Sequence, residues 1–470
     1  KGGKGGGKGG GGKGGRGKGG GGGKGGSDID LRHCQTPRAV VQALAQHKLT
    51  AQHCSHALFV IAKLRSGGDD HFQSTAAWDH LAAALERTVA DMQPRQLSTT
   101  VYSLGKIGAS MGGGLSAAVQ AKVAACAHEL DTIGVSNTLW GLAKGLAAVD
   151  APTDAACVTA LCERAAALLP ELNSQDLSNT LVGLAGIHGS GAAIDSALLS
   201  AAHDRLATAA AAFGPQELCT TLGALGHLPP PPAATLSALI DAAAAQPLLA
   251  PRDLSTIVHG LGRAAAPHHA DTLAPPRLVF ILDGIRERAA RFNAQDISTS
   301  LIGLAALSRL IDVPAAPIHA LQAAAADRAD AFSPPQVANT VWSLSRLAPR
   351  HAAEEATPLM QTAAAARARC VAALQRRAAA CIGGMSAQNC ANLVCGLVRL
   401  GARVDPPLLR AIERHVVDSL HLYDGNALSN ALWGLVKAGH RPTPHSLKAA
   451  LRHAADSLLS GGGGGGGGGG

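Results

Sequence analysis

Basic residues recur in this sequence at one position of a motif that repeats about every 40 residues. Each copy resembles Leu-Ser-Asn-Thr-Leu-Trp-Gly-Leu-Ala-Lys, and we call its first apolar residue the anchor. Nine residues after the anchor, seven of ten copies have Lys or Arg, although these types fill fewer than one position in ten between the terminal tails. This basic column consists of Lys63, Lys106, Lys144, Arg263, Arg346, Arg399 and Lys437. Cations in such a row can neutralise the phosphates of a nucleic acid.

Two further positions of the motif have side chains that could recognise a ligand. Two residues after the anchor, every copy has a hydrogen-bonding side chain. Apart from His56, this polar column consists of Thr99, Asn137, Asn179, Thr220, Thr256, Thr299, Asn339, Asn392 and Asn430. Five residues after the anchor, a ring column contains Phe59, Tyr102, Trp140, Trp342 and Trp433, which include three of the four Trp residues.

The basic, polar and ring columns would lie on one face of a helix, at roughly 180°, 200° and 140° around its axis from the anchor. Each repeat would then present a cation, an amide or hydroxyl group and often a flat ring side by side. Single-stranded RNA is bound by these groups, because they neutralise phosphates, hydrogen-bond base edges and stack on bases. The pattern therefore predicts a noncatalytic RNA-binding surface.

Three structural explanations compete with this interpretation. Basic residues late in a helix also interact with its C-terminal carbonyl groups. Asn and Thr side chains could form hydrogen-bond ladders that fix the register of the repeats. The Trp side chains could pack against the other helix of each pair.

The same motif predicts the fold. Its ten anchors are Cys54, Leu97, Val135, Leu177, Leu218, Leu254, Ile297, Val337, Cys390 and Leu428. Apolar residues also follow four and seven residues after each anchor, so the motif has one apolar stripe at helical spacing. A second amphipathic run separates successive copies, often with Pro or Gly at the junction. We therefore predict an all-α protein, an α-solenoid of about ten tandem helix-turn-helix repeats of roughly 38–43 residues.

Small residues six positions after the anchor predict how the repeats stack. Nine of the ten copies have Gly, Ala or Ser there, and six have Gly, although Gly inside a helix costs about 1 kcal/mol relative to Ala. We expect another backbone to approach the helix at these positions.

The domain boundaries follow from composition. Residues 1–26 contain only Gly, Lys and one Arg, and residues 461–470 are all Gly, so we expect both segments to be disordered. The solenoid should span residues 27–460, with an insertion near residues 348–360 where two anchors lie unusually far apart. The Gly/Lys tail could add nonspecific affinity for phosphate, or it could be a low-complexity linker.

Charge and motifs narrow the function classes. The net charge of +8 contains seven cations of the tail, so the body is nearly neutral and only the placement of its charges argues for RNA. We find no catalytic motif, metal site or cofactor motif and no membrane-spanning stretch, and we expect the ten cysteines to be reduced and mostly buried, such as Cys219, Cys390 and Cys395. The chain begins with Lys, so the absence of a targeting segment from this sequence says nothing about the compartment of the protein.

The repeats resemble octotricopeptide repeats, a family of organellar RNA-binding helical-repeat proteins. The resemblance rests on Phe213-Gly214-Pro215-Gln216-Glu217-Leu218, on residues 332–342 and on Leu428-Ser429-Asn430-Ala431-Leu432-Trp433-Gly434-Leu435, and it covers about residues 45–460. It implies a chloroplast or mitochondrial protein that binds messenger or ribosomal RNA and acts in transcript stabilisation, processing, splicing or translation. Ribosomal or other organellar proteins are further implied partners. The alternative is a protein-binding scaffold of the HEAT or armadillo kind without RNA contact.

Overall fold

The computed structural model describes residues 29–64, 70–109, 112–146, 154–347 and 358–461, and within these ranges it contains 21 α-helices and no β-strand. The helices alternate between two layers, and odd-numbered helices form the first. They are α1 (Pro37–Leu44), α3 (Ala76–Thr88), α5 (Gly113–Cys126), α7 (Ala155–Leu168), α9 (Ser196–Ala209), α11 (Ala233–Ala244), α13 (Pro275–Arg288), α15 (Ala315–Asp327), α17 (Pro358–Cys381), α19 (Pro406–Asp418) and α21 (Pro444–Gly461).

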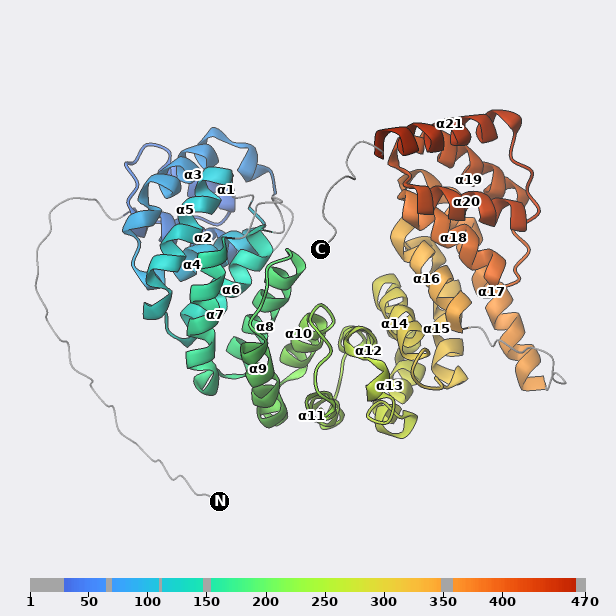
Figure 1. Ribbon diagram of the computed structural model, residues 1–470, viewed down its shortest axis with the longest axis horizontal. Helices are drawn as coiled ribbons and strands as arrows, with labels where there is room; N and C mark the ends of the chain where they lie inside the picture. Colours follow the sequence, from blue (N-terminus) through green and yellow to red (C-terminus); the bar gives the residue numbers. More distant parts are fainter. Residues whose placement is uncertain (1–28, 65–69, 110–111, 147–153, 348–357, 462–470) are drawn as a thin grey trace, which may run out of the picture.

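The second layer consists of the even-numbered helices, each of which contains one anchor. They are α2 (Ala51–Leu64), α4 (Pro94–Ile107), α6 (Thr132–Leu146), α8 (Ser174–Gly189), α10 (Pro215–Leu225), α12 (Pro251–Ala264), α14 (Ala294–Leu307), α16 (Pro334–Leu347), α18 (Ala387–Arg399) and α20 (Gly425–Lys437). Each even helix packs against the next even helix, and odd helices stack in the same way. The ten pairs form an arc (Figure 1). The protein is therefore an all-α solenoid, as the sequence predicts.

The core lies between the two layers. Every anchor and every residue seven positions after it is buried, as are nine of the ten residues four positions after it, with Leu432 partly buried. The large apolar residue five positions before each anchor is also buried, for example Phe292 and Phe332. This residue has an extended backbone after a short 3-10 helix, as at Phe332 (φ −73°, ψ 132°), so it ends the odd helix and starts the turn into the even one.

Close backbone contact between successive even helices explains the small residues six positions after the anchor. A Cβ on Gly141 would lie 2.4 Å from the carbonyl oxygen of Val101, and one on Gly303 would lie 2.6 Å from that of Val258. In both cases the neighbour is the residue four positions after the previous anchor. The expected backbone approach is confirmed, and it sets the spacing of the even-numbered helices.

The insertion extends an odd helix. The sequence places it near residues 348–360, of which residues 348–357 lie outside the described ranges. Helix α17 begins at Pro358 and is 24 residues long, whereas α15 has 13 residues. The terminal segments 1–26 and 462–470, predicted to be disordered, also lie outside the described ranges. No helix within those ranges is long and apolar enough to cross a bilayer.

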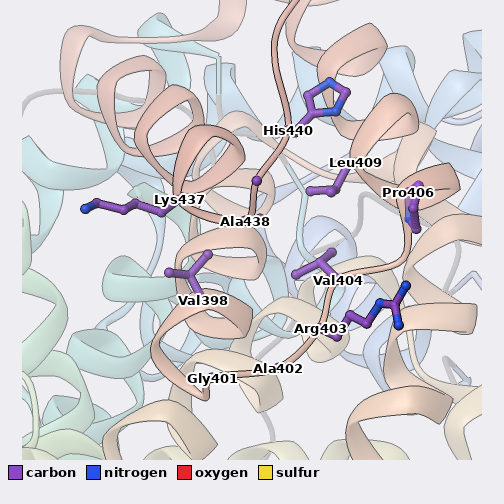
Figure 2. Close-up of a pocket in the computed structure, with 11 residues that line it drawn as sticks. Val398, Gly401, Ala402, Arg403, Val404, Pro406, Leu409, Lys437, Ala438 and His440 are labelled. Atoms are coloured by element: carbon purple, nitrogen blue, oxygen red, sulfur yellow. The ribbon is translucent and has the colours of Figure 1, made fainter.

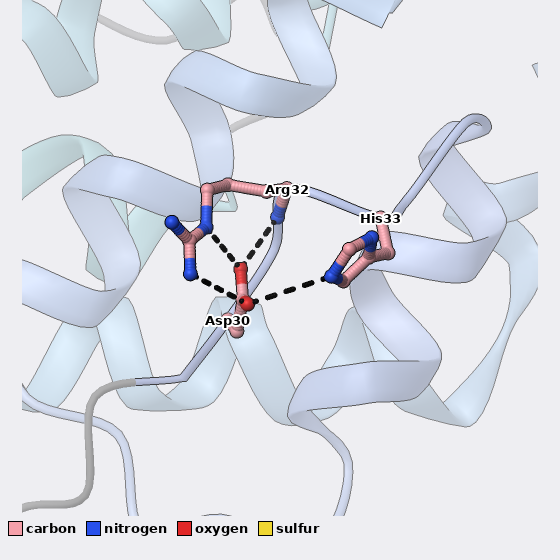
Figure 3. A network of polar contacts seen from close by, with 3 residues as sticks. All are labelled: Asp30, Arg32 and His33. Carbon is pink, nitrogen blue, oxygen red and sulfur yellow. Dashed lines mark hydrogen bonds and ion pairs between the residues drawn. The ribbon is translucent and has the colours of Figure 1, made fainter.

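The described chain begins with a small polar cluster before α1 (Figure 3). The carboxylate of Asp30 accepts hydrogen bonds from the Arg32 backbone N–H at 3.0 Å and from its guanidinium at 2.9 Å, and the ring of His33 lies 3.7 Å away. The Arg32 guanidinium holds the pKa of Asp30 well below its usual value. Both side chains are exposed to water, so this pair contributes little to stability.

Candidate nucleic-acid interface

The even helices expose the face opposite the anchor, and we call this face the inner surface. In Figure 1 the even-numbered helices from α8 to α16 line the inner side of the arc, whereas the odd-numbered helices from α9 to α17 form its outer side. The buried stripe points between the layers, so the residues two, five and nine positions after the anchor face away from it. Tertiary structure therefore places all three columns along the concave side.

All seven residues of the basic column are exposed on the inner surface. They occupy the last turn of their helices. In the described part of the chain, no ion pair joins the six residues other than Lys106 to an acidic residue. From the anchor onward, the ten even helices contain no Asp or Glu. The cations of this surface are therefore not neutralised by neighbours on their own helices.

The stems of two of these cations, Lys144 and Arg263, pack on small residues of the preceding repeat. A Cβ on Gly105 would lie 3.2 Å from the Cβ of Lys144, and one on Gly226 would lie 2.7 Å from the Cβ of Arg263. Each stem is thus supported by the previous helix while its charged end stays in water. This packing aligns the cations of successive repeats.

The ring column contacts the basic column. The rings of Tyr102 and Trp140 lie 5.0 Å apart, between the second helices of successive repeats. Lys63 lies over the Phe59 ring at 4.9 Å. These contacts run along the inner surface, and the Tyr102–Trp140 pair joins neighbouring even helices rather than the two helices of one pair, which was the competing explanation for the Trp positions.

The C-terminal end of the surface has the same combination. The guanidinium of Arg399 lies 4.6 Å from the ring centre of Trp342 in the previous repeat, and the Trp433 side chain is 43% exposed. Partly exposed rings with cations above them are the arrangement that stacks on nucleic-acid bases.

The polar column does not form the hydrogen-bond ladder that the sequence left open. Thr99 and Thr256 donate to backbone carbonyls of their own helices, each at 2.8 Å. The amides of Asn137, Asn179 and Asn339 have no hydrogen-bond partner among the described residues, nor has that of Asn430. No bond joins two residues of this column in the described repeats, so the ladder explanation is wrong for this position.

Register is instead fixed one residue earlier in the motif, where sequence reasoning missed it. The hydroxyl of Ser55 donates to the Gln96 carbonyl at 3.1 Å, and that of Ser136 to the Asp176 carboxylate at 3.2 Å. Ser255 makes the same contact with the carboxylate of the following repeat at 3.4 Å. The sequence contains a signal for these bonds between repeats, because a small polar residue follows most anchors and an acidic or amide residue precedes most of them.

A second set of cations has a structural role on the odd helices. The Arg164 guanidinium donates to the Leu130 carbonyl at 2.7 Å, and that of Arg377 to the Phe332 carbonyl at 2.7 Å. In both pairs the acceptor lies in the turn of the preceding repeat. Arg164 and Arg377 thus fasten successive repeats together, which distinguishes them from the basic column.

One member of the basic column does cap a helix. The Arg263 guanidinium donates to the Gly226 carbonyl at 3.3 Å, at the end of α10, and to Nδ1 of His227 at 3.2 Å. Burial, and then the charges of Arg263 and Lys144, lower the pKa of His227. Arg263 thus caps the preceding even helix rather than its own, and its charge is partly used within the fold.

The buried thiols follow the expectation, with one exception. Cys390 and Cys395 are buried, but Cys219 is only partly buried, and all ten cysteines are free. Burial raises the pKa of Cys390 to about 11. Within the described residues no group of His, Cys, Asp or Glu side chains could hold a metal ion.

A cavity of about 460 Å³ opens between the loops that follow α18 and α20 (Figure 2). Arg403 and His440 line it, and Lys437 lies at its edge with its ammonium group pointing away. The His440 ring is held by the Glu413 carboxylate at 2.6 Å, and hydrogen bonds from Ser446, Thr443 and His440 lower the pKa of Glu413 to about 2 against the effect of its burial. This hydrogen bond fixes the loop, so the His440 ring is engaged within the fold.

The fold and the inner surface define an α-solenoid repeat protein with a basic, ring-bearing concave face. Residues 3–230, slightly less than half of the chain, match the family model described as Tbc2 translation factor, N-terminal domain. This match links the N-terminal part of the chain to a translation-factor family. No curated protein matches the chain.

Two solved structures are similar at 10% sequence identity. One is a homology model of the full-length AP-3 complex in an intermediate open conformation, with 90% of this chain and 75% of that chain covered and a TM-score of 0.24. The other is the crystal structure of the pentatricopeptide repeat protein PPR10 from maize, with 90% of each chain covered and a TM-score of 0.11.

Proposed function

We propose that this protein binds single-stranded RNA on its inner surface, without catalysis, and acts in organellar RNA metabolism or translation. The observation that carries the proposal is the row of seven exposed cations on helices without acids after the anchor. The rings beside these cations and the free amides of the polar column supply stacking and base-edge contacts.

The translation-factor match of residues 3–230 supports a role in translation. The resemblance of the motif to octotricopeptide repeats supports an organelle, chloroplast or mitochondrion, as the compartment. The RNA partner would be an organellar messenger or ribosomal RNA, and the residues in contact with it would be those of the three columns.

A salt titration of RNA binding tests the proposal. If between three and seven column cations contact phosphates, the log–log slope of affinity against salt should lie between about −2 and −5, at roughly 0.7 per phosphate of a single strand. The inner variant replaces Lys63, Lys144, Arg346 and Lys437 by Ala in the full chain, because all four are exposed and none makes a hydrogen bond within the described structure. We expect its slope to be shallower by up to about 3, the full change applying when all four cations contact phosphates.

A matched control removes the same charge from the odd layer. Arg38, Arg376, Arg410 and Arg414 are also exposed, and none makes a hydrogen bond or ion pair with the described residues. Replacing these four by Ala should leave the slope of the inner surface nearly unchanged. Equal effects of the two variants would contradict the site, and no binding at low salt would favour the protein-binding scaffold instead.

A further inference from the structure

The inner surface is not uniform along the arc. At the N-terminal end, three successive repeats each have both a ring and a cation. They are Phe59 with Lys63, Tyr102 with Lys106, and Trp140 with Lys144, on helices α2, α4 and α6. The first two cations lie over the rings of their own helices, at 4.9 and 5.9 Å, and the last two rings touch each other. We call these three repeats the N-terminal block.

The C-terminal end has a similar arrangement on helices α16, α18 and α20, which form the C-terminal block, although α18 has the buried Cys395 in place of a ring. Trp342 and Arg346 share α16, and the guanidinium of Arg399 on α18 covers the Trp342 ring. Trp433 and Lys437 follow on α20, both exposed. Figure 1 places the two blocks at opposite ends of the arc.

The four repeats between the blocks lack this combination. Their ring-column positions are Val182, Gly223, His259 and Ile302, and their basic-column positions are Gly186, His227, Arg263 and Ala306. A Cβ at Gly223 would meet no atom within 4 Å, so the surface there is open. Arg263 is the one Lys or Arg of the column in this central stretch, and its guanidinium is bonded to the Gly226 carbonyl and to His227.

The one ring of the ring column in the central stretch is the imidazole of His259. It is half-buried, and burial together with the charges of Arg263 and His227 lowers its pKa, so it is neutral at neutral pH. The central repeats thus supply no Phe, Tyr or Trp ring in these two columns, and their one Lys or Arg side chain, that of Arg263, is engaged within the fold.

From this distribution we infer that the protein recognises a bipartite single-stranded RNA. Each block holds a short unpaired segment by stacking and phosphate contact, and the RNA between the segments crosses the central repeats without base stacking. This inference rests on the proposed function and specifies its substrate class. The two segments act together because binding of one raises the local concentration of the other.

Modified oligonucleotides test the inference with the full chain. The parent RNA has ten nucleotides, one for each repeat. In the spacer-abasic RNA the four central nucleotides lack bases, and in the end-abasic RNA three nucleotides at each end lack bases. We expect the spacer-abasic RNA to bind within about threefold of the parent and the end-abasic RNA to bind at least tenfold more weakly, because each stacked base contributes to affinity.

Protein variants assign each effect to a block. Replacing Trp140 by Leu should remove the affinity that the bases at one end of the spacer-abasic RNA contribute. Replacing Trp342 by Leu should remove the affinity that the bases at the other end contribute. His259→Leu in the central stretch is the control and should change neither. All three side chains are at least partly exposed, and circular dichroism would verify folding.

The possible outcomes are distinct. If loss of the central bases weakens binding as much as loss of the end bases, the site is continuous and the bipartite inference is wrong, although the proposed function stands. If none of the oligonucleotides binds at low salt, the proposed function itself fails and the inference fails with it.

Discussion

Two glycines on the inner helices should respond in opposite ways to the same substitution. Gly141 lies in α6 against the backbone of α4, where a Cβ would be 2.4 Å from the Val101 carbonyl oxygen and 2.8 Å from the Tyr102 nitrogen. Gly223 lies in α10, where a Cβ would meet nothing within 4 Å. Both have ordinary helical backbones, so only the packing differs.

The magnitudes follow from two opposing effects. Ala is favoured over Gly inside a helix by about 1 kcal/mol. An added methyl group in a packed interface costs about 1–3 kcal/mol, and at Gly141 we expect the upper part of this range, about 2–3 kcal/mol, because the obstacle is backbone, which cannot rotate away as a side chain could. We expect Gly141→Ala to lower the free energy of unfolding by about 1–2 kcal/mol and Gly223→Ala to raise it by about 0.5–1 kcal/mol.

Urea denaturation followed by circular dichroism gives the order of stability of the three proteins. Hydrogen exchange then locates the effect, which should fall on α4 and α6 for Gly141→Ala because repeats interact mainly with their neighbours. If Gly141→Ala is as stable as the parent chain, the helices separate without penalty and the proposed role of these glycines in spacing is wrong.

Three further changes test other contacts. His269 is buried, its Nδ1 accepts from the Ala266 N–H, and burial lowers its pKa. The stability that its neutral ring contributes is therefore present above pH 6.5 and is lost as the pH falls toward the lowered pKa. The urea midpoint of His269→Gln should accordingly fall less between pH 7.5 and 5.5 than that of the parent chain. Arg377→Met should cost about 1–3 kcal/mol by removing a charged hydrogen-bond donor, and the exposed Arg376→Met less than about 0.5 kcal/mol, a difference that urea midpoints would measure and that equal midpoints would contradict. Burial raises the pKa of Cys370 to about 12, so a thiol reagent at pH 8 should modify it only after unfolding, and rapid reaction in the folded chain would disprove its burial.

The motif alone was sufficient to predict the repeats and the buried stripe. Apolar residues spaced by four and then three positions give a helix one apolar face, which must be buried. Ten tandem copies of such a helix predict a solenoid as the simplest fold. The sequence also placed the three columns on one face, since this depends only on helical geometry. The boundaries of the insertion could not be predicted in full, because an Ala-rich segment can extend a helix, as α17 does.

The roles of individual polar residues required the tertiary structure. Arg164 and Lys144 are both basic residues of repeat helices, yet one is bonded to a carbonyl of the preceding repeat and the other is exposed on the inner surface. Likewise, Ser136 joins two repeats, whereas its neighbour Asn137 has no partner among the described residues.

The sequence by itself thus determined the repeat, the identity of the core residues and the chemistry available on one helical face. Only the tertiary structure decided that this face lines the concave side of an arc, that Arg263 is engaged in the fold, and that the ring column and the other six cations of the basic column lie at the two ends of the arc. The physical reason is that periodicity along one helix fixes directions around its axis, while contacts between helices depend on which backbones approach most closely.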